Sequence, residues 1–363
     1  MANYILKRIL LMIPTLFGIM LVNFILVQFA PGGPIDQIIE QMSSTDSGTV
    51  STRATGAASD MGSSSLVDGG NNPAARGLDP ELLAELEKQF GFDKPLHERF
   101  FIMIWNYATF EFGDSYYQDT PVVDLVLDRL PVSISLGLWS LMLIYMISIP
   151  LGVHKAVKDG THFDIWTSAV IFVAYAIPGF LIAIMLIIVF AGGSYFDWFP
   201  LRGLVSDDWA EMSLPGKIRD YFWHLALPIT SLTIGGFATL TMLTKNSFLE
   251  EISKQFVLTA RAKGLTEGQV MYGHVFRNAM LIVIAGFPAA LIGILFTGSM
   301  LIEVIFSLNG IGLLGFEAVI TRDYPIMFGT LFVFTIIGLI LNLIGDITYT
   351  LIDPRIDFET REV

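Results

Sequence analysis

Hydrophobic residues gather along the chain in six long, nearly uncharged runs separated by polar connections. An α-helix rises about 1.5 Å per residue, so about 20 apolar residues cross the hydrocarbon core of a bilayer, which is roughly 30 Å thick. Each run reaches that length, and the pattern therefore predicts an all-α polytopic membrane protein with six transmembrane helices. We expect them at Ile9–Ala30, Leu130–Val153, Ile165–Phe190, Phe222–Thr244, Ala279–Ile302 and Ile326–Ile352.

The longest polar region, residues 31–129, separates the first two predicted spans. Residues 43–72 are rich in Ser, Gly, Thr and Ala, a composition that buries no core and predicts a mobile loop. Residues 79–91 and 96–110 place apolar side chains at helical spacing, which predicts two amphipathic helices. Both are too short or too polar to span a bilayer. Contact with a partner and packing against the spans both remain open as their role.

The distribution of lysine and arginine predicts the orientation. Six spans place both termini on the same side of the membrane. The connections on that side are 1–8, 154–164, 245–278 and 353–363. They hold 11 basic residues in 64 positions, against 10 in the 153 positions of the other connections. Basic residues are enriched on the cytoplasmic side, so we expect both termini, the 245–278 loop and the 353–363 tail to be cytoplasmic.

Composition narrows the class of protein. Only 15% of the residues are charged and the mean hydropathy is +0.63, whereas soluble domains carry about 25% charged residues. The chain has no cysteine, which excludes disulfides and thiolate metal sites, and its five histidines lack metal-ligand spacing. No P-loop pattern and no G-x-S-x-G pattern occurs, so we expect neither ATP binding by a P-loop nor serine hydrolase chemistry, and no enzyme activity.

One charged residue, Asp346, lies inside the predicted spans. Asn342 precedes it by four residues, so the two share one face of the last helix. Charges inside a membrane are costly and often functional. A proton or ion relay needs more groups than this pair supplies, but both a structural helix contact and a functional polar pair remain open.

The 245–278 loop carries a helical pattern that ends at a glycine. Apolar residues recur at intervals of 3, 4 and 4 from Leu249 to Ala260, which predicts one continuous helix from about Ser247. Lys263 falls in its last turn, where a cation suits the helix dipole. Gly264 then suits the left-handed position that commonly ends a helix.

A second helix is predicted directly after this turn. Thr266 and Gln269 have the spacing of a capping box, and Val270, Met271 and Phe276 supply an apolar side. The small residues Ala260, Ala262 and Gly264, placed beside cations, suit docking into a groove on another protein. The alternative is a pair of interfacial helices whose cations face lipid headgroups.

Several motifs resemble those of one transporter family. TARAKG followed by RNA, the stretch ILKRILLMIPTLFGIMLVNFILVQFAPGGP, FGFDKPLHERF, RDYPIMFGTLF and the ending DPRID resemble the permeases of dipeptide and oligopeptide ABC importers. The insert at residues 41–78 and AGGSYFDWFPLRGLVS look most similar to the permease subunit of importers of microcin C and oligopeptides in Gram-negative bacteria. Leu258 stands where the general EAA pattern of ABC importer permeases has glutamate, and Ile282 stands where many relatives have proline.

The resemblance implies a type I ABC importer permease fold in the bacterial inner membrane, in which residues 1–30 hold the first span, residues 31–129 are periplasmic and residues 130–352 form the core. It implies a subunit that lines a pathway for peptides or microcin C-like conjugates together with a second homologous permease. ABC ATPase subunits would bind ATP and Mg, and a periplasmic peptide-binding protein would deliver substrate. No cofactor in this chain and no nucleic-acid partner is expected. The stand-alone secondary transporter or channel is the alternative.

The resemblance also implies which residues contact the ATPases. The turn would transmit the movement of the ATPase subunits to the spans. The residues expected there are Thr259, Ala260, Arg261, Ala262, Lys263, Gly264 and Leu265.

Overall fold

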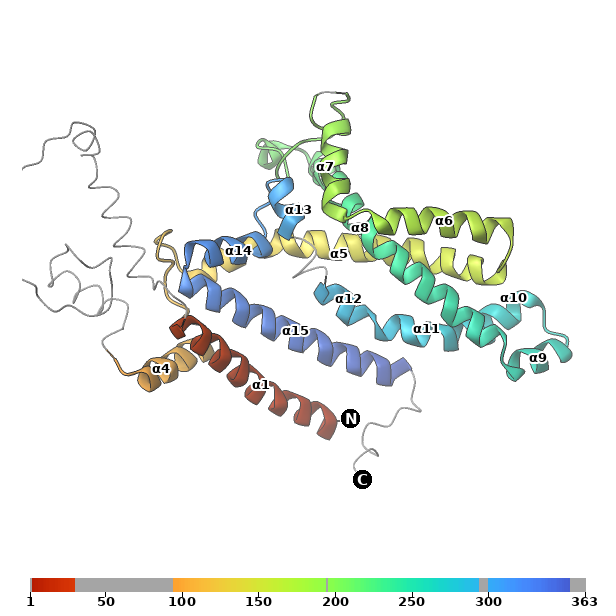
Figure 1. Ribbon diagram of the computed structural model, residues 1–363, viewed down its shortest axis with the longest axis horizontal. Helices are drawn as coiled ribbons and strands as arrows, with labels where there is room; N and C mark the ends of the chain where they lie inside the picture. The colour runs from red at the N-terminus through yellow and green to blue at the C-terminus, as the bar shows by residue number, and fades with distance from the viewer. Residues whose placement is uncertain (1, 30–93, 194, 294–299, 353–363) are drawn as a thin grey trace, which may run out of the picture. The chain divides into compact units, whose positions relative to one another are not determined.

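The computed structural model describes residues 2–29, 94–193, 195–293 and 300–352 (Figure 1). The predicted loop at 43–72, the predicted helix at 79–91, the insert at 41–78 and the tail 353–363 lie outside these residues. The described part is helical, and its only bridge of the β type joins Asp114 to Pro121. The α-helices are α1 (Ala2–Phe29), α4 (Leu96–Ala108), α5 (Val122–Val157), α6 (His162–Ala176), α7 (Gly179–Phe190), α8 (Leu214–Ile252), α9 (Gln255–Ala262), α10 (Glu267–Val270), α11 (Phe276–Ala285), α12 (Phe287–Gly293), α13 (Met300–Ile305), α14 (Ile311–Thr321) and α15 (Tyr324–Ile352).

Among the described residues, five stretches of helix are long and apolar enough to cross a membrane. They are Ile5–Ile25, Val122–Val157, Leu214–Ile252, Glu267–Gly293 and Tyr324–Thr348. The helices α6 and α7 make a sixth if the bent pair is counted as one span. An all-α polytopic membrane protein is therefore confirmed, with a long helix at or near every predicted span except Ile165–Phe190.

The predicted continuous helix over Ile165–Phe190 is wrong, because the chain bends by 91° between α6 and α7. Pro178 lies at the start of α7, and Ile177 before it adopts an extended conformation with φ −91° and ψ 120°. Proline has no N–H to continue the helical hydrogen bonds, and it disfavours a helical conformation at the residue before it. A proline at this position therefore breaks the span.

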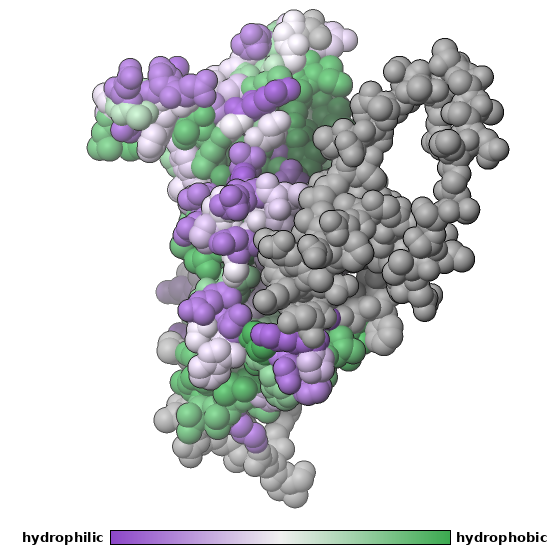
Figure 2. All heavy atoms as spheres, turned by 90° about the vertical axis from the view of Figure 1, so that its left-hand side faces the viewer, coloured by the Kyte–Doolittle hydropathy of each residue, from purple (hydrophilic) through white to green (hydrophobic). Residues whose placement is uncertain are grey.

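The surface is as apolar as the sequence predicts. On α6, Trp166 is 71% exposed and Val170 and Val173 are each 65% exposed. Figure 2 shows hydrophobic side chains lying open on one face of the molecule, between patches of hydrophilic ones. Large exposed apolar areas are rare on soluble monomers, so these helices are suited to lipid or to other membrane helices.

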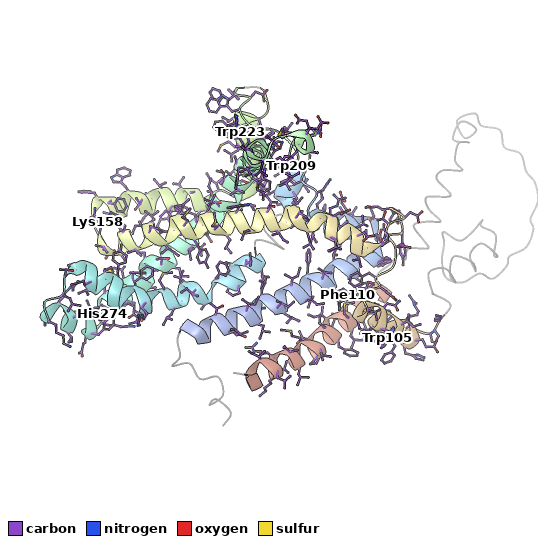
Figure 3. The ribbon with its side chains drawn as sticks, turned by 180° about the vertical axis from the view of Figure 1, so that it is seen from behind. Trp105, Phe110, Lys158, Trp209, Trp223 and His274 are labelled. Carbon is purple, nitrogen blue, oxygen red and sulfur yellow. The ribbon has the colours of Figure 1, made fainter. Side chains whose placement is uncertain are left out.

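The chain divides into two compact units. The first is Met1–Met12, Asp124–Glu317 and Val333–Val363, and the second is Ile13–Val123 and Ala318–Phe332. In the second unit α4 confirms the predicted amphipathic helix at 96–110. The Phe100 ring packs against Phe17 and Phe24 at 5.4 and 5.3 Å between centroids, while Trp105 is 70% exposed (Figure 3).

The described residues of the first unit include two apolar cores. In this unit α8 packs against α6, α7 and α11. One core joins α5, α7, α8 and α13, and includes Leu136, Ala183 and Leu225. The other joins α5 and α8 to α9, α10 and α11, and includes Phe248 and Val275, both fully buried. This second core lies beneath the candidate functional site.

Candidate functional site

The segment between α8 and α11, residues 253–275, is named here the connecting segment. The sequence predicts one helix from about Ser247 to Lys263, and this is wrong in one respect, because α8 ends at Ile252 and α9 begins at Gln255. Lys254 is extended, with φ −76° and ψ 152°, and its ammonium pairs with the Glu251 carboxylate from the preceding turn. The apolar spacing continues across this break, which is why the pattern does not reveal it.

The turn after α9 has the predicted geometry. Gly264 has φ +83°, and its N–H donates to the Arg261 carbonyl at 2.9 Å. The Leu265 N–H donates to the Ala260 carbonyl at 3.3 Å. A Cβ on Gly264 would meet nothing within 4 Å, so the left-handed backbone alone favours glycine here.

The predicted capping box is also confirmed. The Thr266 N–H donates to Gln269 Oε1 at 3.0 Å, and the Gln269 N–H donates to Thr266 Oγ1 at 3.4 Å. The helix that starts here is one α turn, α10, which continues through a π-helix at Met271–Val275 into α11. The connecting segment therefore runs directly into a helix long enough to span the membrane.

Some of the residues predicted to contact the ATPases are buried and others are exposed. Ala260 was expected on an exposed surface of small residues, and this is wrong, because it is only 7% exposed. It lies three residues after Val257 on the face of α9 that packs into the core with Val270. Thr259, Ala262, Lys263 and Gly264 are exposed, whereas Leu265 is half-buried against the same core.

Large side chains beside the turn, Leu258 and Tyr272, are exposed. Leu258 is 61% exposed on α9, and Tyr272 is 69% exposed on the π-helix. Leu258 is the residue that stands where the general EAA pattern has glutamate. The exposed face of the connecting segment therefore combines small, apolar and cationic side chains.

The cations of this segment differ in their surroundings. The Arg261 guanidinium donates to both oxygens of Glu267, at 2.8 and 3.0 Å, across the turn. This pair lowers the pKa of the Glu267 carboxyl and raises the pKa of Arg261. Arg261 therefore fastens α9 to α10. Lys263 is exposed at the end of α9, and it is better suited than Arg261 to an acidic partner.

Asp346, the charged residue inside the last predicted span, lies beside a cation of the first helix. Arg8 Nη2 is 2.9 Å from Asp346 Oδ2, with the two side chains 45% and 28% exposed. Asn342 is exposed one turn away. The contact shows Asp346 in an ion pair between α1 and α15.

Glu303 and the group of Lys155, Asp164 and Lys245 are buried charged sites that the sequence pattern did not predict. Glu303 on α13 is fully buried and accepts from the Leu313 N–H at 2.7 Å and from Ser133 Oγ at 3.2 Å. A Cβ on Gly310 would lie 2.3 Å from this carboxylate, so glycine leaves the space that Glu303 occupies. The available signal was a glutamate directly after an apolar run, although its position beyond the predicted span indicated a loop.

The second missed site joins Lys155, Asp164 and Lys245. Asp164 Oδ1 lies 2.9 Å from Lys155 Nζ, and Asp164 Oδ2 lies 2.7 Å from Lys245 Nζ. The two lysines entered the sequence analysis only as basic residues of loops. Their common partner is 81 residues away from Lys245, a separation that no local pattern bridges.

Known proteins similar to this chain include permeases of ABC transporters. Residues 148–358 match the family model "Binding-protein-dependent transport system inner membrane component". The peptidoglycan transport system permease protein YejB of Agrobacterium fabrum is 58% identical over 365 residues, covering 100% of both chains. The inner membrane ABC transporter permease protein YejB of Escherichia coli O157:H7 is 56% identical, covering 99% of this chain and 100% of its own.

More distant similarities agree. The oligopeptide transport system permease protein AppB of Bacillus subtilis is 30% identical, covering 99% of this chain and 100% of its own. Among solved structures, a chain of the MetNI methionine ABC transporter in an inward-facing conformation matches with a TM-score of 0.50 and 18% identity. That match covers 63% of this chain and 97% of the other, and it shows the fold alone.

Proposed function

Because this chain belongs to the family of binding-protein-dependent transport system inner membrane components, we propose that it is the transmembrane permease subunit of an ATP-driven peptide importer. The permeases named above for oligopeptide and peptidoglycan transport support the substrate class. In this proposal the chain is a transport component, and ATP with Mg is bound by partner ATPase subunits.

The observation that carries the proposal is the turn at Gly264. It presents exposed Ala262, Lys263 and Gly264 on one side, while Ala260 and Val257 pack into a core shared with α5 and α8. A partner that pushes on this turn therefore pushes on helices of spanning length. We infer that ATPase subunits contact residues 259–265, with Ala260 acting from beneath the contact.

The remaining parts of the proposal concern partners and orientation. A second homologous permease completes the pathway, and a periplasmic binding protein delivers peptide. The density of lysine and arginine supports cytoplasmic termini in the bacterial inner membrane. ATP binding needs to shift the equilibrium between the two conformations of the helix bundle by a few kcal/mol. Contacts at the turn that differ between these conformations are able to supply this free energy.

The substrate has two finer candidates. The relative named for peptidoglycan transport is 58% identical, which favours peptides derived from peptidoglycan. Microcin C-like conjugates are the other candidate, favoured by the insert at 41–78 and the stretch AGGSYFDWFPLRGLVS. Competition between each of these compounds and a labelled oligopeptide for uptake separates the candidates.

Substitution of Gly264 tests the coupling role. Gly264→Asp puts a side chain on a left-handed backbone and a carboxylate beside Lys263, so peptide uptake is expected to be abolished while the chain still inserts. Gly268→Asp is the matched control, since it makes the same chemical change at an exposed glycine without positive φ that has nothing within 4 Å. Equal uptake by both variants would contradict the coupling role.

Purification from membranes in mild detergent separates the proposal from its rival. The permease proposal predicts that ATPase subunits and a second permease co-purify with the tagged chain, and that uptake requires ATP. Peptide uptake by the purified chain alone, reconstituted into vesicles, would instead identify a stand-alone secondary transporter or channel.

A further inference from the structure

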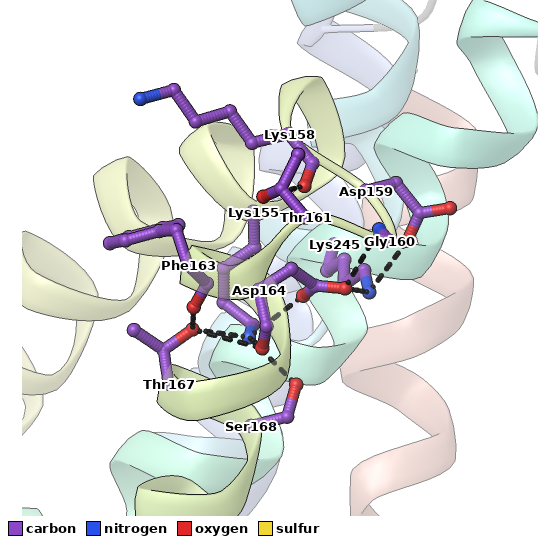
Figure 4. A network of polar contacts seen from close by, with 10 residues as sticks. All are labelled: Lys155, Lys158, Asp159, Gly160, Thr161, Phe163, Asp164, Thr167, Ser168 and Lys245. Carbon is purple, nitrogen blue, oxygen red and sulfur yellow. Dashed lines mark hydrogen bonds and ion pairs between the residues drawn. The ribbon is translucent and has the colours of Figure 1, made fainter.

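Four charged side chains form a cluster where α5, α6 and α8 meet (Figure 4). The ion cluster is defined as Lys155, Asp159, Asp164 and Lys245. Asp164 lies between two ammonium groups, at 2.9 Å from Lys155 and 2.7 Å from Lys245. Lys245 also pairs with Asp159 Oδ1 at 2.8 Å. The cluster therefore joins the last turn of α5 and the turn after it to the first turn of α6 and the last third of α8.

The buried lysine ties α5 to α6 beyond its ion pair. The Lys155 side chain is fully buried, and its ammonium donates to the Asp164 carbonyl at 2.9 Å, to Thr167 Oγ1 at 2.7 Å and to Ser168 Oγ at 2.8 Å. A buried cation is strongly destabilised when its partners are lost. The end of α5 and the start of α6 are therefore held in one arrangement.

Between α5 and α8 the helices meet without space between them. A Cβ on Gly152 would lie 2.6 Å from Thr244 Cβ and 2.8 Å from the Thr241 carbonyl oxygen. One turn earlier, Ser148 Oγ donates to the Phe237 carbonyl at 3.1 Å. Small residues let helix backbones approach closely in membranes. Sliding of α5 along α8 would therefore force backbone atoms into contact.

From the ion cluster, α8 leads to the connecting segment. Lys245 precedes Ile252 by seven residues, which is about 10 Å of helix. Phe248 between them is fully buried in the core that also holds Val257 and Val275. A displacement of α9 would therefore move the C-terminal end of α8, which also carries Lys245 of the ion cluster.

We propose that Lys245 is a positioning residue for energy coupling, because through Asp164 it makes the cytoplasmic parts of α5, α6 and α8 move as one body. Packed interfaces of this kind hold one of a few discrete arrangements and do not deform continuously. Movement of the turn at Gly264 would then reorient three membrane helices together. The inference rests on the proposed ATP-driven transport.

The test compares Lys245→Met with Lys158→Met in the complete transporter, purified with its second permease and ATPases and reconstituted with binding protein. Lys158 is exposed in the turn after α5, and its ammonium lies outside the ion cluster, over the Phe163 ring (Figure 4). Both changes remove one cation. The readout is the number of peptides imported per ATP hydrolysed, because a loss of folding alone lowers the amount of complex and leaves this ratio unchanged.

We expect Lys245→Met to lower the ratio about tenfold, within the usual range of coupling between distant sites, with ATP hydrolysis retained. Lys158→Met should keep the ratio of the unaltered complex, and Lys245→Arg should restore most of it, because a cation returns opposite Asp164. An unchanged ratio in assembled Lys245→Met complexes would overturn the inference.

Lys245→Gln serves if the Lys245→Met complex fails to assemble, because its amide can still donate a hydrogen bond to Asp164 while the cation is lost. Asp159→Asn is then a further control, since Asp159 is 52% exposed and its loss leaves Asp164 beside both lysines. A lowered ratio in Lys245→Gln supports the inference, and a ratio equal to that of the unaltered complex overturns it. Failure of the proposed function has a different result, since the unaltered complex would then show no ATP-dependent uptake.

Discussion

The turn at Gly264 and the ion cluster at Lys245 are each held partly by ion pairs, but in opposite surroundings. At the turn, Arg261 and Glu267 are 39% and 70% exposed, whereas in the cluster Lys155 and Asp164 are 0% and 8% exposed. An exposed pair adds little stability, and a buried pair costs much when one partner is removed. The comparison indicates that the turn depends on backbone geometry and surface shape, while the cluster depends on its charges.

Asp164→Asn is expected to have the largest effect on stability. It leaves the buried Lys155 ammonium without its carboxylate, which destabilises a protein by roughly 3–5 kcal/mol. Thermal unfolding of the purified complex measures the loss, with Asp159→Asn as the control at the exposed edge of the same cluster. Equal melting temperatures for the two variants would mean that the contribution of these charges to stability does not depend on their burial.

Gly152→Val tests the close contact beside the cluster. The added Cβ would lie 2.8 Å from the Thr241 carbonyl oxygen, so the helices must separate, and overpacking of this kind costs about 1–3 kcal/mol. Gly235→Val on α8 is the control, because nothing lies within 4 Å of a Cβ there. Thermal unfolding should show a lower melting temperature for Gly152→Val alone.

Thr266→Ala tests the turn by removing half of its capping box. Loss of such a cap costs about 1 kcal/mol. Amide hydrogen exchange in residues 266–270 should become faster, while the global melting temperature changes less than in Asp164→Asn. If exchange is unaltered, the box does not hold α10 in place.

The pH dependence of the turn is the smallest expected effect. Arg261 lowers the pKa of Glu267 in the folded chain, so the stabilisation is present above the usual pKa of glutamate and is lost as pH falls through the lowered value. Amide exchange at the turn, corrected for its intrinsic pH dependence, should show this loss in acid. The Glu267→Gln variant should show no such loss of stabilisation in acid. If the loss persists in Glu267→Gln, a group other than Glu267 causes it.

The turn was predictable from sequence because its signals are local. Gly264 ends a helix five residues before Gln269 completes the next cap, and both features follow from neighbouring residues. The burial of Ala260 follows from the apolar face, Leu249 to Ala260, that the sequence predicts, and its assignment to an exposed docking surface conflicted with that face. The break at Lys254 was hidden because the apolar spacing continues across it.

The ion cluster was not predictable because its partners are distant in sequence. Lys155 and Lys245 lie near the ends of apolar helices, where a cation ordinarily indicates the cytoplasmic side. Only the packing of α5, α6 and α8 brings both to Asp164. The bend at Pro178, in contrast, could have been predicted from the sequence. Proline disfavours a helical conformation at the residue before it, and Ile177 is extended.

Site-directed cross-linking at the turn tests the central claim most directly. The chain contains no cysteine, so Ala262→Cys provides a single thiol on the exposed face of α9. Lys158→Cys provides a matched thiol in the other connection expected on the same side of the membrane. A thiol-reactive cross-linker in native membranes should join Ala262→Cys to an ATPase subunit, more strongly than Lys158→Cys. Cross-linking of the ATPase to Lys158→Cys and not to Ala262→Cys would contradict the account.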